Sequence, residues 1–452
     1  MTEGRDVRLW MKMVVVIGMT LAILVPLAMV RGVVHERQEY RQQVVRDVAA
    51  SHGRAQTFAG PVLVVPYRER VEVEEADAQG IVRTASRVRE DAWTFFPTAL
   101  EVDGELRPDV RRRNLHQVRV YEWDATAMAR FEVEIPADPG PAADRRIGEP
   151  YLSYAIGDVS GLRRATLEVD GTARTPEPGQ GYRPGEGMHV RLAALGPGRT
   201  HRIDARLGFV LAGTERLSVL PLGDSNTIVL SSSWPHPGFG GASPRRREIG
   251  RDGFRAEWDI PGLATNARDF LLHAVREGGN DGPREVAMAE TVGVTLVDPV
   301  DAYAMTDRAT KYGLLFVLLT FVGFFIFELV KQLPIHPIQY GLVGLALAIF
   351  FLLLLSLGEH FPFGWSYLAA AVACIGLIAF YLSAVLRSVW RALGFAAMLA
   401  TLYACLYGLL VSEDNALVLG AGLLFVILAA LMTVTRKVDW YQLGGALPRV
   451  RP

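Results

Sequence analysis

The segment between Tyr312 and Arg436 constrains the fold most strongly, because it is apolar and divided into pieces of similar length. A helix rises ~1.5 Å per residue, so ~20 apolar residues cross the ~30 Å hydrocarbon core of a bilayer. Each piece is near that length and is apolar on all sides, unlike the amphipathic helices of soluble proteins. The sequence therefore predicts five transmembrane helices: Gly313–Val330, Gly341–Leu357, Trp365–Leu386, Ala392–Val411 and Ala416–Val434.

A sixth apolar run, Met13–Val30, follows the charged leader Met1–Lys12. Its 18 residues exceed the apolar region of a typical cleaved signal peptide, and Arg31 follows with no small-x-small cleavage site. We therefore predict an uncleaved signal-anchor helix. Apolar residues continue at helical spacing over Arg31–Ala55, so the helix is expected to extend beyond the membrane.

The average composition of the chain conceals a polar central region between apolar, membrane-like ends. The chain has 452 residues, a net charge of −1 and a mean hydropathy of +0.21, yet residues 31–312 are polar and charged. The balanced charge gives no support for a nucleic-acid partner. The two cysteines, Cys374 and Cys405, both lie in predicted membrane helices. The polar region is therefore expected to fold without disulfides or thiolate metal sites.

The placement of Lys and Arg predicts the orientation in the membrane. If the N-terminus is cytoplasmic, the short outer loops near residues 358–363 and 412–415 contain no Lys or Arg. Arg31 and Arg37 depart from the rule, but they lead into a long region, where the rule is weak. We predict that both termini are cytoplasmic, including the tail 435–452, and that residues 31–312 lie outside. The inner segments then hold Arg5, Arg8, Lys12, Lys331, Arg387, Arg391, Arg436, Lys437, Arg449 and Arg451.

The region from Pro61 to Val300 is rich in short runs that alternate apolar and polar residues, as strands do. Asp-Gly pairs at 103–104, 170–171 and 252–253 predict turns, and Asn266–Val275 predicts a short helix. Many short strands with Pro- and Gly-rich spacers predict a large, antiparallel, sandwich-like β-rich domain. The sequence leaves open whether this domain is single or is divided into two sub-domains near residues 140–150. The expected fold class is thus a membrane protein with an all-α bundle and a β-rich extracytoplasmic domain.

Several segments resemble one family of bacterial inner-membrane proteins, the CreD family. The outer region contains "QTFAGPVLVVPY" (Gln56–Tyr67), "EPYLSYAIGDVSGL" (Glu149–Leu162), "SSSWPHPGFGGASP" (Ser231–Pro244) and "DGFRAEW" (Asp252–Trp258). The membrane region contains "HPIQYGLVGLALAIFFLLLLSLGEHFPFGWSYLAAA" (His336–Ala371), and the tail contains "VDWYQL" (Val438–Leu443). The resemblance implies a cytoplasmic-membrane protein linked to envelope integrity. In some bacteria it also implies a Cre-type regulon connected with β-lactam response and colicin tolerance. It implies no biochemical activity.

Known catalytic spacings are absent from the sequence. It contains no H-E-x-x-H, G-x-S-x-G, P-loop or G-x-G-x-x-G motif that opens a helix. The nine histidines are scattered, and His189 and His201 are expected to lie on different strands. We therefore predict no catalytic residue, metal or cofactor, although folding could still bring Asp, His and Ser together.

The turn Trp234-Pro235-His236-Pro237, followed by Phe239, is the most unusual stretch of the outer region. Two prolines stiffen it, so it could present Trp234, His236 and Phe239 to a ligand or partner. The alternative is a loop corner that packs Trp234 into the sandwich. We favour packing, because aromatic side chains are buried more often than they bind.

Glu359 and His360 are the candidate site at the membrane interface, at the outer end of the second apolar piece. They could relay protons or hold a cation or lipid headgroup. The alternative, which we favour, is an interfacial polar cap that reaches headgroup water, so that neither residue needs to be paired. The cap would be flanked by an aromatic belt of Phe361, Phe363, Trp365 and Tyr367.

The sequence as a whole favours a non-enzymatic membrane protein that supports the cell envelope. Its β-rich domain would bind an envelope component or partner, and its bundle would anchor in the lipid bilayer or transmit a signal. One alternative is a transporter or lipid-handling protein, which predicts a cavity at the bilayer midplane. Another is a hydrolase, which predicts a cleft with a convergent acid, base and nucleophile. The ligand, the partner and the oligomeric state are not specified by the sequence.

Overall fold

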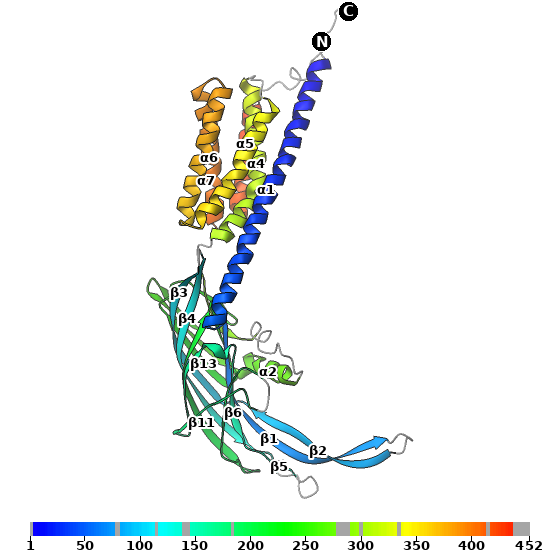
Figure 1. Cartoon of the computed structure of the whole chain (residues 1–452), viewed down its shortest axis with the longest axis vertical. Helices are drawn as coiled ribbons and strands as arrows, with labels where there is room; N and C mark the ends of the chain where they lie inside the picture. The colour runs from blue at the N-terminus through cyan, green and yellow to red at the C-terminus, as the bar shows by residue number, and fades with distance from the viewer. Residues whose placement is uncertain are drawn as a thin grey trace, which may run out of the picture. The chain divides into compact units, whose positions relative to one another are not determined.

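The computed structural model describes residues 3–76, 82–113, 116–137, 145–181, 185–276, 290–297, 302–331, 336–412 and 416–436. The chain forms two compact units (Figure 1). One unit comprises Met1–Gln42 and Val300–Pro452 and is helical, and the other comprises Gln43–Pro299 and is β-rich. Each unit is described by itself.

Six long helices supply the helical unit, as the apolar runs predict. Their bounds are α1 Glu3–His52, α4 Ala302–Lys331, α5 Pro337–Gly358, α6 Phe363–Val385, α7 Val389–Val411 and α8 Ala416–Thr435. Among the described residues, α1, α4, α5, α6 and α7 each contain a segment long and apolar enough to cross a membrane. The helix α8 is equally apolar in sequence. A multi-pass membrane protein with an additional N-terminal helix is therefore confirmed.

Helix α1 packs on the bundle along a narrow apolar stripe. Its buried residues Ile23, Leu27, Val30 and Val34 recur at intervals of three or four, which places them on one helical face. Close approach depends on glycines in the partner helices. A Cβ atom on Gly313 of α4 would lie 2.9 Å from Leu27 Cδ1, and one on Gly344 of α5 would lie 2.6 Å from Ile23 Cγ1. Small residues at such positions are typical of helix interfaces in membranes.

The centre of the bundle is aromatic. Phe350 of α5 contacts Tyr403 of α7 and Tyr367 of α6 edge to face, with ring centroids 4.6 and 5.4 Å apart. The Tyr367 hydroxyl donates a hydrogen bond to the Tyr403 carbonyl at 2.7 Å, and the Tyr403 hydroxyl contacts Cys374 Sγ at 3.2 Å. The buried hydroxyls are thus satisfied inside the protein, as a site without water requires.

The β-rich unit contains two sheets. The first sheet has the order β14-β17-β12-β1-β6-β10-β9, and β2 and β5 also pair with β1. Its strands are β1 Gln56–Ala76, β2 Val82–Phe95, β5 Arg146–Ile147, β6 Tyr151–Ile156, β9 Glu177–Pro178, β10 Gly187–Arg191, β12 Arg216–Leu220, β14 Pro237–Gly240 and β17 Val292–Leu296. The strands β1 and β2 form a long hairpin (Figure 1).

The second sheet has the order β15-β16-β13-β3-β4-β11-β7-β8. Its strands are β3 Ala99–Arg113, β4 His116–Glu134, β7 Leu162–Val169, β8 Thr172–Arg174, β11 Thr200–Thr214, β13 Ser225–Ser232, β15 Arg246–Gly250 and β16 Gly253–Pro261. The described residues of the unit also form three short helices: η1 Val159–Gly161, η2 Gly262–Ala264 and α2 Ala267–Arg276. The predicted helix near Asn266–Val275 is therefore confirmed as α2.

One hydrophobic core lies between the two sheets, so the unit is a sandwich. Phe58 of the first sheet stacks on Phe209 of the second, with ring centroids 4.9 Å apart, and meets Trp123 edge to face at 6.0 Å. Leu100 and Leu152, which lie on either side of residues 140–150, belong to the same core. The two halves of the region therefore form one compact unit.

Two details of the sheets differ from the sequence-based expectation. The sheets are mixed, because β1 pairs with β12 and β3 with β13 in parallel. The turn predicted at Asp103-Gly104 is also wrong, since both residues lie inside β3 and pair with β4 and β13. Gly104 serves packing instead: a Cβ there would lie 2.3 Å from Trp123 Nε1. The turns predicted at residues 170–171 and near residues 252–253 are confirmed.

Candidate functional site

Glu359 forms the centre of a polar cluster at one end of the helical unit. It caps the C-terminus of α5, and its side chain is only 10% exposed. Its Oε1 atom lies 3.7 Å from Arg37 Nε of α1 and accepts a hydrogen bond from the Tyr303 hydroxyl of α4 at 3.3 Å. The expectation that Glu359 needs no partner is therefore wrong. Residues of α1 and α4 cover the carboxylate and replace water around it.

Asp307 of α4 forms a second, similar pair. Its side chain is 15% exposed, and its Oδ1 atom lies 3.9 Å from Arg31 Nε of α1. Its Oδ2 atom lies 2.7 Å from Nζ of Lys311, one turn along the same helix. Arg31 and Arg37, the two arginines that depart from the Lys/Arg rule, thus each face a carboxylate of the bundle.

His360 behaves differently from its neighbour. It is exposed, and its Nδ1 atom lies 3.1 Å from the carbonyl oxygen of Ser356. Glu359 therefore points into the bundle while His360 remains at the surface, so the structure does not bring the two side chains together. The predicted aromatic belt is similarly divided: Phe361 and Trp365 are exposed, whereas Phe363 and Tyr367 are buried.

Sequence reasoning missed Tyr303 and Asp307 as partners of the cluster. The apolar piece that predicts this helix begins at Gly313, whereas α4 begins at Ala302. The additional turns are polar, so hydropathy alone does not reveal them. The arginines at 31 and 37, unusual for their position, are the signal that could have pointed to acidic partners.

The aromatic residues of the outer loop pack into the sandwich. Trp234 donates a hydrogen bond from Nε1 to the Val297 carbonyl at 3.1 Å, and the guanidinium of Arg119 lies 5.0 Å from its ring centroid. Phe239 lies in β14 and meets Phe254 and Trp258 of β16 edge to face, both at 5.8 Å. His236 is exposed. Trp234 and Phe239 are thus partly buried and pack against the sandwich core.

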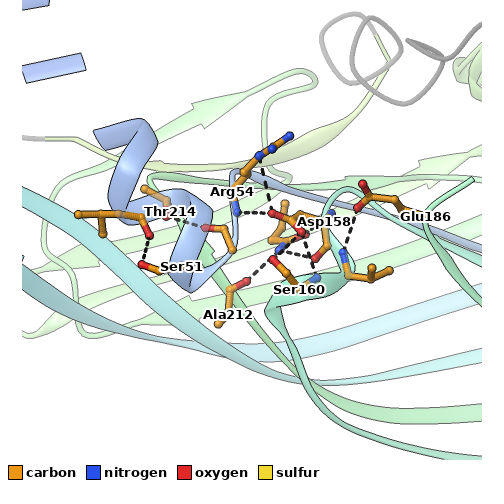
Figure 2. A network of polar contacts seen from close by, with 11 residues as sticks. Ser51, Arg54, Asp158, Ser160, Glu186, Ala212 and Thr214 are labelled. Atoms are coloured by element: carbon orange, nitrogen blue, oxygen red, sulfur yellow. Dashed lines mark hydrogen bonds and ion pairs between the residues drawn. The ribbon is translucent and has the colours of Figure 1, made fainter. Parts of the chain in front are cut away.

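A buried polar network joins three segments of the β-rich unit (Figure 2). The side-chain amide of Gln56, at the start of β1, donates to the carbonyls of Asp158 at 3.0 Å and Ala212 at 2.8 Å. Its oxygen accepts from the Asp158 N–H at 3.1 Å. Gly161 makes this approach possible, since a Cβ there would lie 2.2 Å from the Ala212 oxygen. One amide thereby connects β1, the η1 turn and β11.

The carboxylate of Asp158 is the charged member of this network. It accepts hydrogen bonds from the Arg54 N–H at 3.0 Å, the Ser160 N–H at 3.0 Å and the Ser160 hydroxyl at 2.6 Å. Burial acts to raise the pKa of Asp158, but these hydrogen bonds outweigh it and hold the pKa below the ordinary value. The contacts of Asp158 are those of an N-cap for η1, which is a structural role.

The ring nitrogens of His189 and His201 contact backbone carbonyls. His189 lies on β10 with Nδ1 2.9 Å from the Gly179 carbonyl, and His201 lies on β11 with Nε2 2.9 Å from the Gly196 carbonyl. They are on different strands, as expected. Within the described part of the chain, no three His, Cys, Asp or Glu residues are placed to hold a metal ion.

The helical unit also contains an apolar groove between α6 and α7. Its volume is about 590 Å³. Small residues form part of its lining, and Trp365 and Leu368 beside them are exposed. The lining includes Trp365, Leu368, Ala371, Tyr403, Ala404 and Tyr407. Its mostly apolar lining suits a hydrocarbon chain better than a polar ligand.

Comparison with known proteins agrees with this architecture. A family described as "Inner membrane protein CreD" matches residues 8–441. The inner membrane protein CreD of Escherichia coli (strain K12) is 36% identical over 446 residues, which cover 98% of this chain and 96% of that protein. The chain belongs to the CreD family. The protein is thus an inner-membrane protein by family.

Similarity to solved structures is weak. An M1 zinc metallopeptidase from Deinococcus radiodurans is 10% identical with a TM-score of 0.20, covering 44% of this chain and 42% of that chain. A mutant of that enzyme bound to a Tyr-Ser-Ala substrate gives a TM-score of 0.21 at the same identity. The present chain thus spans less than half of these proteins. Scores this low carry no argument about fold or activity.

Two of the motifs that resemble the CreD family contact each other in the sandwich. The motif that begins at Gln56 and the motif that contains Asp158 are 102 residues apart in sequence, and they meet in the buried network of Figure 2. In this member of the family, the two motifs therefore join strands of the sandwich.

Proposed function

We propose that this CreD-family protein is a non-enzymatic inner-membrane protein that supports cell-envelope integrity. Its β-sandwich would bind an envelope component or a protein partner, and its helical bundle would anchor the protein in the bilayer or transmit a signal. The supporting observation is the use of the polar groups that converge in the sandwich. The Ser160 hydroxyl donates to the Asp158 carboxylate, and the Gln56 amide donates to the backbone carbonyls of Asp158 and Ala212, so these polar groups find their partners inside the protein.

Complementation separates this proposal from a hydrolase. Cells that lack the gene should become sensitive in an envelope-stress assay, and the wild-type chain should restore tolerance. A chain with Ser160→Ala should restore it equally, because the Ser160 hydroxyl only supports the Asp158 carboxylate. Loss of function with normal amounts of protein in the membrane would favour the hydrolase instead.

The proposal places both termini in the cytoplasm and the sandwich in the periplasm. The Lys/Arg-free short loops support this orientation. Reporter fusions after residues 200 and 413 should report the periplasm, and fusions after 335, 389 and 445 should report the cytoplasm. A cytoplasmic signal at 200 would overturn the orientation.

A second candidate function, lipid handling, is favoured by the groove between α6 and α7. If the groove holds a lipid chain, Ala404→Phe should fill it, reduce the lipid that co-purifies and impair envelope function. Leu393→Phe is the matched control, because Leu393 lies on the exposed surface of α7 and is not among the groove residues. If Ala404→Phe and Leu393→Phe retain the same amount of lipid and the same function, the groove does not bind a lipid that the function needs.

A further inference from the structure

Helix α1 belongs to both compact units. The first unit ends its N-terminal part at Gln42 and the second begins at Gln43, yet α1 is one helix from Glu3 to His52. We propose that the pairs Arg31–Asp307 and Arg37–Glu359 form a latch that fixes the rotation of α1 in the bundle. When the latch opens, rotation of α1 transmits conformational changes between the β-sandwich and the membrane helices. The inference goes beyond the proposed function, which assigns no role to either pair.

The two arginines lie on opposite sides of the buried stripe of α1. Successive residues of a helix are ~100° apart, so Arg31 lies about 60° to one side of Val34 and Arg37 about 60° to the other. Arg31 reaches α4 through Asp307, and Arg37 reaches α5 through Glu359. Rotation of α1 in either direction would move at least one guanidinium away from its carboxylate. Two contacts on opposite sides therefore define a single rotational position.

Apolar packing alone would hold this position weakly. Inside a bilayer, lipid tails solvate an apolar stripe about as well as a neighbouring helix does, so polar contacts and close packing determine orientation. Both carboxylates are largely shielded from solvent, at 10% and 15% exposure, which strengthens their attraction to the arginines. Gln38 adds a third contact, because its Nε2 atom donates to the Tyr303 carbonyl at 3.4 Å.

Charge reversal combined with cross-linking tests the latch. Leu27→Cys and Gly313→Cys place thiols where α1 and α4 are in contact, in a full chain that carries Cys374→Ser and Cys405→Ala. Serine at position 374 keeps a hydrogen-bonding group beside the Tyr403 hydroxyl. Oxidation in membranes should join the two helices efficiently. Glu359→Arg, added to this chain, should lower the cross-linking yield several-fold.

The reciprocal exchange is the decisive variant. Arg37→Glu together with Glu359→Arg should restore the yield, because the exchanged charges attract again. Exchange of Arg202 and Glu132, an exposed pair on the second sheet, should leave the yield unchanged. Equal yields for Glu359→Arg and the unmodified latch would overturn the latch. This readout does not depend on the envelope assay, so it can fail while the proposed function stands.

Transmission through α1 is tested by locking it. After oxidation, the chain with cysteines at Leu27 and Gly313 should lose envelope function, because α1 can no longer rotate. The same double-cysteine chain kept reduced should keep function, since it carries both substitutions but not the bond. Full function of the quantitatively cross-linked protein would overturn transmission.

Discussion

Gln56→Leu should destabilise the β-rich unit more than a typical single substitution. The Gln56 side chain is 1% exposed and makes three hydrogen bonds, to the Asp158 carbonyl, the Asp158 N–H and the Ala212 carbonyl. Leucine has a similar size but can make none of these bonds. The three backbone groups would then remain buried without the amide.

The expected magnitude follows from those bonds. Each hydrogen bond contributes about 1 kcal/mol net, and a buried polar group left unsatisfied costs about 1–3 kcal/mol. Because the carbonyls could recover part of this cost from water, we expect a loss of about 3–5 kcal/mol in the free energy of unfolding. Such a loss would be a large fraction of the stability of an ordinary domain.

The loss is measured by urea unfolding of the purified full chain in detergent. At each urea concentration, a protease cleaves the β-rich unit only where it is unfolded, so the uncleaved fraction reports the folded population. The matched control is Gln180→Leu, because the Gln180 amide donates one hydrogen bond, to the Glu186 carbonyl, at an exposed position. We expect the control to lose less than about 1 kcal/mol. Equal stability losses for the two variants would refute the argument that the buried amide joins the strands.

Four further predictions concern other parts of the chain. The pKa of Asp158 is lowered from 3.8 in the folded state, so its stabilising effect should be complete above that value and disappear as the pH falls through the folded pKa; the stability difference between wild type and Asp158→Asn should therefore shrink below pH 3.8. Gly104→Ala should cost about 1–3 kcal/mol by urea unfolding, because the new methyl group would meet Trp123. Thermal unfolding of the β-rich unit should be the same with and without EDTA or reductant, and a large drop with EDTA would reveal a metal site. His360→Gln should leave membrane insertion and envelope function unchanged in complementation, because the ring is exposed and its described hydrogen bond is to a carbonyl one turn earlier.

Local sequence patterns predicted the membrane helices well. Each of the five C-terminal apolar pieces coincides with one helix to within a few residues, except at the start of α4, whereas α1 begins ten residues before the apolar run Met13–Val30. Length and hydropathy determine such segments, because backbone polar groups in lipid must be satisfied within the helix itself. Alternation likewise predicted strands, and the turn near residues 170–171 followed from the conformational preferences of Asp and Gly.

The same local rules failed where a distant residue decides the environment. Asp103-Gly104 reads as a turn, yet Trp123 from the neighbouring strand requires glycine at that position inside β3. The parallel pairing of β1 with β12 also joins segments far apart in the chain. Turn propensity describes a residue and its neighbours only, whereas packing depends on which side chain arrives from elsewhere.

By itself, the sequence determined the class of this protein, its membrane segments and its family resemblance, because these depend on local composition and on the order of motifs. Tertiary structure alone decided that Glu359 is held by Arg37 and Tyr303 while His360 stays exposed. It also decided that Gln56 bonds to residues more than a hundred positions away. Desolvation by neighbouring helices and strands sets the partners of a charged or polar side chain, and that environment exists only once the chain has folded.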